Sequence, residues 1–94
     1  FIIGPPDDGI SFLDVVCASE SEGKWATRAV MREVADIAFH RMGLRALWVQ
    51  IYSKKALSAA LAAGFIPATP LDIDVPVLVM TPSIASHFTQ RKDN

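Results

Sequence analysis

The chain has 94 residues, of which 51% are hydrophobic and 20% are charged, and its formal net charge is −1. This length supports one small domain, and this composition is typical of a globular chain and excludes a disordered one. The interspersed charges give no strong field for nucleic acid or an anionic membrane, and no apolar run approaches the about 20 residues of a membrane span, so we expect neither partner.

The first residues predict a β-hairpin. Phe1–Ile3 and Ile10–Cys17 are β-prone runs, and the segment between them consists almost entirely of turn-forming residues. Phe1–Ile3 already has the character of a strand interior, and the chain does not begin with Met. We therefore expect a fragment or a processed product in which the N-terminal part of the fold is missing.

One amphipathic helix is predicted next, up to Met42. Ser19 stands three residues before Glu22, which is the spacing of a capping box. Apolar residues then recur at helical spacing, namely Ala26, Val30, Val34, Ile37 and Ala38. Gly43 supplies the left-handed residue that commonly ends a helix.

The second half predicts strand, helix and strand. Leu44–Tyr52 alternates with the period of a strand, and Lys54–Ala63 is an alanine- and leucine-rich helix that Gly64 ends. Phe65–Ile66 begins another short extended piece.

Val75–Met80 is the last predicted strand, and Pro76 within it indicates either a strand start or an edge. The polar tail, Ser86–Asn94, is expected to fray. The domain is therefore expected to span residues 1–85.

The strand that ends at Cys17 and the strand that contains Trp48 are joined through a crossover helix, so they should be parallel. The predicted fold class is α/β (α+β), a mixed sheet with a hairpin, a crossover helix, a parallel strand, a short helix and a terminal strand.

This order from Ile10 to Met80, with a short helix ending in Gly64-Phe65, resembles the C-terminal half of the GNAT superfamily of N-acetyltransferases. In that family the strand before the crossover helix pairs with pantetheine, and the following loop and helix start bind the pyrophosphate of acetyl-CoA through backbone amides. The resemblance implies a set of cofactor-binding positions, which are Val15, Cys17, Gly23, Lys24, Trp25, Ala26, Thr27 and Arg28.

The family motif is Gln or Arg, two residues, Gly, one residue, then Gly or Ala. It aligns on Glu22 to Thr27, where Glu22, Trp25 and Thr27 depart from all three defining positions. Only Gly23 and Lys24 look like a common variant of the motif. We expect Glu20 and Glu22 to neutralise the positive end of the helix and to repel a pyrophosphate, although Lys24 and Arg28 could offset that repulsion.

The family's other hallmarks are an asparagine after the parallel strand and a tyrosine that protonates the departing thiolate. Ser53 and Ala60 stand at these positions, so the usual general acid is absent. Tyr52 carries the only phenol of the chain, and a catalytic role for it is the less favoured reading.

Other residues have structural readings beside their functional ones. Cys17 alone gives neither a disulfide nor a zinc-ligand set, so it is read as a small hydrophobe in a reducing, cytoplasmic compartment. His40 is read as a surface residue near a helix end, and His87 carries no argument. Two pairs of residues have open alternatives. Asp72 and Asp74 either face an amine substrate or serve solubility. Trp25 and Trp48 either lie in the core or belong to a contact surface.

These departures favour a GNAT-like domain with reduced or lost acetyl-CoA-dependent N-acetyltransferase activity that acts as a protein-binding or structural component. The alternative is an active enzyme that transfers acetyl directly from acetyl-CoA to an amine. The cofactor is then acetyl-CoA or none, and a protein partner or a second copy of the chain is expected. The pattern is also similar to GNAT-like internal virion proteins of tailed phages, which implies a location inside a phage particle instead of the cytoplasm.

Overall fold

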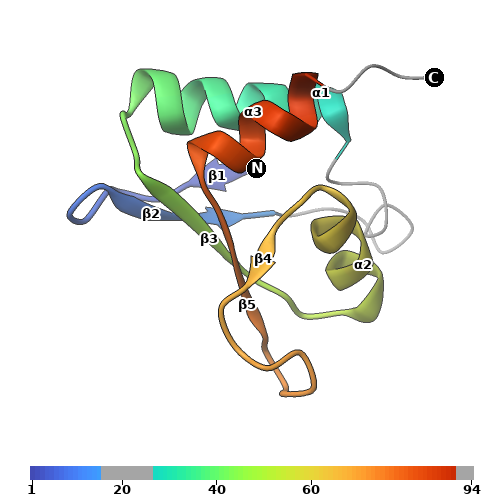
Figure 1. Ribbon diagram of the computed structural model, residues 1–94. Coiled ribbons are helices and arrows are strands. Elements are labelled where there is room, and N and C mark those ends of the chain that lie inside the picture. The colour runs from blue at the N-terminus through green and yellow to red at the C-terminus, as the bar shows by residue number, and fades with distance from the viewer. Residues whose placement is uncertain (16–26, 91–94) are drawn as a thin grey trace.

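The computed structural model describes residues 1–15 and 27–90, and Figure 1 shows their arrangement. The elements are β1 (Ile2–Ile3), β2 (Ile10–Asp14), α1 (Arg28–Ala35), its π-helical continuation η2 (Asp36–Arg41), β3 (Ala46–Gln50), α2 (Lys54–Ala62), β4 (Ile66–Pro67), β5 (Val77–Met80) and α3 (Pro82–Gln90). The predicted mixture of helices and strands is confirmed.

All the named strands form one mixed sheet in the order β1-β2-β3-β5-β4. Strands β2 and β3 are parallel, as the crossover helix predicted, and the other neighbours are antiparallel. The N-terminal hairpin is confirmed, with Ile3 opposite Leu13. Pro76 precedes β5, which lies inside the sheet, so the reading as a strand start is correct and the reading as an edge is wrong.

The first helix begins later than predicted. Thr27 has an extended backbone, with φ −69° and ψ 163°, and its hydroxyl oxygen accepts a hydrogen bond from the Val30 N–H at 3.3 Å. Thr27 is therefore the N-cap of α1. The prediction of one continuous helix from Ser19 is wrong because Thr27 interrupts it, and Ser19 and Glu22 themselves lie outside the described residues.

The helix ends through a wider turn. The Met42 N–H donates to the Ile37 carbonyl at 2.9 Å, a π-helical spacing, and the same spacing brings Arg41 to within 2.9 Å of Asp36. Gly43 then has φ +67°, which confirms its predicted role as the left-handed stop.

Helix α2 matches its prediction closely. The Ser53 hydroxyl oxygen accepts a hydrogen bond from the Ala56 N–H at 3.1 Å, so a side-chain cap fixes the helix start. Gly64 has φ +97° and ends the helix as expected.

A C-terminal helix, α3, that the sequence did not predict includes the first part of the polar tail. Ser86 to Gln90 belong to α3, and only residues 91–94 of the expected tail lie outside the described residues. The Thr81 hydroxyl oxygen accepts a hydrogen bond from the Ile84 N–H at 3.3 Å, and Pro82 is suited to the first helical position. Phe88 lies against α1, with its ring 5.7 Å from the Arg28 guanidinium carbon.

The core lies on one side of the sheet. Strand residues that alternate along β2, β3 and β5 meet side chains from every helix in a single buried cluster. The strand members are Leu13, Leu47, Val49, Leu78 and Met80, and the helix members include Met31, Val34, Ala38, Ala60 and Ala85. Figure 1 shows α1 and α3 side by side on one side of β1, β2 and β3.

Candidate functional site

The predicted cofactor residues fall into two groups. Cys17, Gly23, Lys24, Trp25 and Ala26 lie outside the described residues. The remaining three are Val15, which follows β2 and packs against the core, and Thr27 and Arg28 at the start of α1.

The start of α1 differs electrostatically from the expectation. Its first turn contains no acidic residue and begins with Arg28. Glu20 and Glu22 lie outside the described residues, so their predicted effect on the positive end of the helix stays a prediction. The Thr27 hydroxyl satisfies the Val30 N–H, and Arg28 faces Phe88 of α3.

The position of the expected general acid is sealed in the core. Ala60 has 0% of its surface exposed, so even a larger side chain there would have to displace core atoms to reach a substrate. Ser53 serves as the cap of α2. Tyr52 is 74% exposed, and its hydroxyl donates to Gln50 Oε1 at 3.0 Å.

Tyr52 borders two cavities at the carboxyl end of β3. The smaller, of about 170 Å³, lies beside the ends of β2 and β3, with Asp14 and Gln50 in its wall. The larger, of about 350 Å³, lies between the start of α2 and the loop before β5, and its walls include Lys54, Asp72 and Asp74. The structure thus brings Asp72 and Asp74 to one cavity together with the only phenol.

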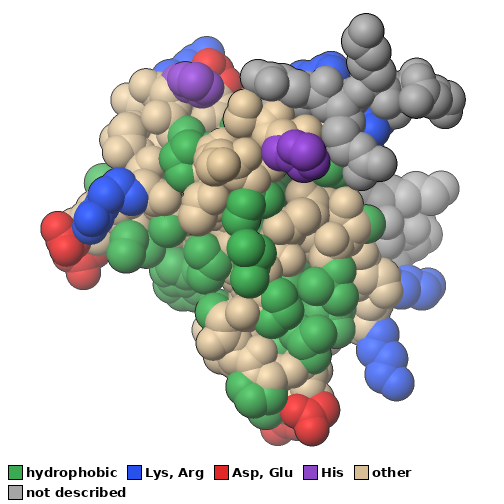
Figure 2. All heavy atoms as spheres, in the orientation of Figure 1, with side chains coloured by type: hydrophobic (Ala, Val, Ile, Leu, Met, Phe, Trp, Pro, Cys, Tyr) green, Lys and Arg blue, Asp and Glu red, His purple; other side chains and the backbone are tan. Residues whose placement is uncertain are grey.

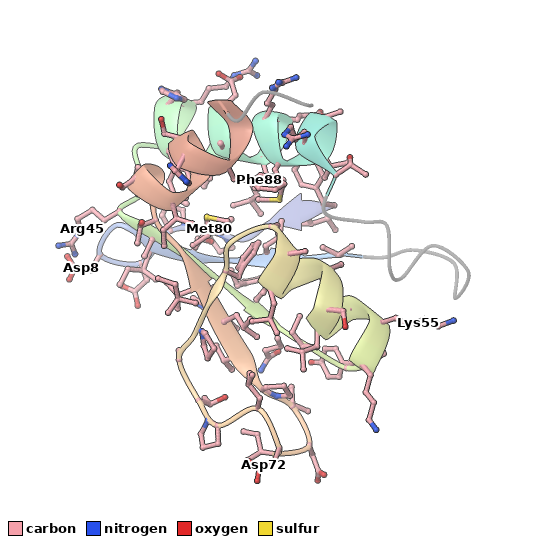
Figure 3. The ribbon with its side chains drawn as sticks, turned by 45° about the vertical axis from the view of Figure 1, so that its right-hand side comes forward. Asp8, Arg45, Lys55, Asp72, Met80 and Phe88 are labelled. Atoms are coloured by element: carbon pink, nitrogen blue, oxygen red, sulfur yellow. The ribbon has the colours of Figure 1, made fainter. Side chains whose placement is uncertain are left out.

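The loop between β4 and β5 forms an acidic tip. Figure 3 shows Asp72 at the end of this loop, far from Asp8 of the β1–β2 hairpin and from Arg45, which precedes β3. In Figure 2 hydrophobic side chains gather over α2 and β4 above the acidic tip. The exposed apolar residues of this region are Leu61, Ile66, Leu71 and Ile73.

The histidines are at the surface, as expected for His40. His40 is exposed at the end of η2, and His87 is exposed on α3 beside a shallow cavity with Phe88. Among the described residues, no three His, Cys, Asp or Glu side chains are grouped as a metal site requires. None of the helices in the described ranges is long and apolar enough to cross a membrane.

The sheet face that the helices leave uncovered is the feature that sequence reasoning missed. The strand pairing aligns Phe12, Trp48, Val79 and Ile66 in one row across β2, β3, β5 and β4. None of these four belongs to the core cluster. Ile2 and Ile10 extend the same face and, like Ile66, are exposed. We call these six residues the open face.

An aromatic pair forms the centre of the open face. The rings of Phe12 and Trp48 are 5.5 Å apart and inclined by 46°. On the hairpin side of this pair lies a hollow of about 400 Å³, bordered by Asp7, Asp8 and Ile10. On its other side lies the 170 Å³ cavity with Asp14. Of the two readings of Trp48, the structure supports a contact surface, because the ring is only partly buried on the uncovered side.

No protein-family model, no curated protein and no solved structure matches the chain.

Proposed function

We propose that this chain is a GNAT-like acetyltransferase-fold domain in which acetyl-CoA-dependent acetyl transfer is reduced or lost, and that it acts by binding another protein. The observation that carries the proposal is the open face. A row of apolar side chains at the surface, centred on two aromatic rings, is typical of an interaction site. The topology, with two parallel strands joined through α1, supports the relation to the GNAT fold.

The residues at the catalytic positions of the resemblance support the loss of chemistry. An alanine has no proton to donate, and Ala60 is sealed in the core. Tyr52 could donate a proton, but its hydroxyl donates to Gln50, and the phenol lies on a different element from the expected acid. Within the described residues, no other phenol is present to take this role.

One observation favours the alternative, an active N-acetyltransferase. The helix start at Arg28 follows directly after the segment that aligns with the pyrophosphate motif, and its first turn contains no carboxylate to repel an anion. An amine acceptor would then find Asp72 and Asp74 beside Tyr52 in the 350 Å³ cavity. This alternative requires acetyl-CoA to bind, which is directly measurable.

Calorimetric titration with acetyl-CoA separates the two functions. The proposal predicts no saturable heat from the unaltered chain up to millimolar ligand. A double variant, Glu22→Arg with Trp25→Gly, restores the cation and the small residue of the motif and should gain measurable binding. Saturable binding of the unaltered chain in the micromolar range would contradict the proposal and favour the active enzyme instead.

A matched control guards against a general effect of added positive charge. Glu33→Arg makes the same charge change on the exposed side of α1, away from the motif. It should leave acetyl-CoA binding undetectable. If it produces as much binding as the double variant, the gain reflects net charge and the motif argument fails.

A further inference from the structure

The open face leaves apolar surface in contact with water that a sheet normally buries. Ile2, Ile66 and Ile10 expose 59%, 53% and 40% of their surface. Sheets are stable when each apolar face packs against another layer, and a parallel pair such as β2 and β3 is usually covered on both sides. The helices described in the structure cover the opposite side only.

In the described part of the chain, the charged side chains that border the two hollows of the open face are carboxylates. Asp14 lies beside Phe12 and Trp48 at one end, and Asp7 and Asp8 lie at the other. Asp8 is 3.5 Å from Arg45, but neither Asp7 nor Asp14 is within salt-bridge distance of a cation from residues 1–15 or 27–90. Neither hollow is bordered by a lysine or arginine.

This charge pattern selects among possible occupants. A second copy of the chain would place its acidic rim against the same rim, and like charges brought together at an interface disfavour association. An anionic membrane is repelled for the same reason. A basic partner gains attraction at both ends, and a cation above the Trp48 ring would gain further stabilisation.

We infer that the open face is the docking site for a basic amphipathic helix of another protein. Its apolar stripe would cover Phe12, Trp48 and Val79, and its lysine or arginine side chains would reach Asp14 and Asp7. Strand β2 spans about 16 Å, at about 3.3 Å per residue, which corresponds to about 11 residues of helix at 1.5 Å each. The cations at the two ends of the stripe should therefore be about three turns apart. This inference rests on the proposed function and specifies its partner.

Synthetic peptides of about 18 residues provide the probe. The first has a leucine stripe flanked by lysines, the second has glutamates in place of the lysines, and the third has the composition of the first without helical periodicity. Calorimetry should show saturable binding of the leucine–lysine helix to the unaltered chain, and at least about tenfold weaker binding of the other two. Binding should weaken as salt is added.

Two charge variants locate the contact. The double variant Asp7→Asn with Asp14→Asn should bind the leucine–lysine helix about three- to tenfold more weakly, since charge pairs at the rim of an interface contribute modestly. Glu33→Gln with Asp36→Asn makes the same net change on the helical side of the molecule and should alter the affinity by less than about twofold. Circular dichroism of both variants checks that each remains folded.

Several results would overturn the inference. These are equal binding of the lysine and glutamate helices, equal effects of the two charge variants, no binding of any peptide, or a concentration-dependent dimer in sedimentation that a Trp48→Ser substitution abolishes. An acetyl-CoA titration of the same samples distinguishes a failure of the docking site from a failure of the proposed function. If acetyl-CoA binds and the lysine helix also binds, the loss of chemistry is wrong while the docking site stands.

Discussion

Gly4 makes room for the aromatic pair at the centre of the open face. It is buried, its N–H donates to the Phe12 carbonyl at 3.0 Å, and a Cβ added to it would collide with the Phe12 ring. The Ser11 hydroxyl also donates to the Gly4 carbonyl, so the backbone of Gly4 cannot easily shift away. The absence of a side chain at Gly4 therefore allows the Phe12 ring to take its position.

We predict that Gly4→Ala lowers the free energy of unfolding by about 1–3 kcal/mol, the usual cost of forcing extra atoms into a packed site. Urea denaturation measures it. In a Phe12→Ala background the same substitution should cost much less, because the colliding ring is gone. An equal cost in both backgrounds would show that the ring does not lie over Gly4.

Helix α1 starts at its N-cap Thr27 and not at the capping box that the sequence predicted. Ser19 with Glu22 has the spacing of a capping box, whereas Thr27 caps the helix through the Val30 N–H. Thr27 was not predicted as a cap, although it also precedes apolar residues at helical spacing. The predicted stop at Gly43 had no such competitor and was correct.

We predict that Thr27→Ala lowers the free energy of unfolding by about 0.5–2 kcal/mol through loss of the N-cap. Ser19→Ala should change it by less than about 0.5 kcal/mol. Both values come from chemical denaturation. The assigned helix start is wrong if Ser19→Ala proves the more costly of the two substitutions.

Helix α3 went unpredicted because its sequence is mostly polar. Its apolar contacts come from a few residues, Ile84, Ala85 and Phe88, and the signal that could have revealed it was Thr81 followed by Pro82. The partner of Phe88 is Arg28 of α1, which is distant in the chain, so the contact could not be read from local periodicity.

We predict that Phe88→Ala lowers the free energy of unfolding by about 1–3 kcal/mol, less than a fully buried phenylalanine because the ring is partly exposed. The exposed neighbour His87 is the matched control, and His87→Ala should change it by less than about 0.5 kcal/mol. Two near-zero values from thermal or chemical denaturation would mean that the segment frays after all.

At the scale of the whole molecule, the sequence predicted the connections better than the layers. The hairpin, the parallel pair and the order of helices follow from local pattern and from the handedness of crossovers. The uncovered side of the sheet does not, because Phe12 and Trp48 have the same alternating pattern as strand residues covered by a second layer. The candidate site was also only partly predictable. Asp72 and Asp74 line the same cavity as Tyr52 because the β4–β5 loop carries them there, and no local sequence signal defines the path of this loop.

The central claim is that the aromatic centre of the open face is available to a partner. Trp25→Phe leaves Trp48 as the only tryptophan, so its fluorescence reports on this face alone. We predict the emission of a partly exposed indole that acrylamide quenches in the folded chain, and protection from quenching when the leucine–lysine helix is added. A blue-shifted emission that acrylamide does not quench in the chain by itself would contradict the account, because the face would already be covered.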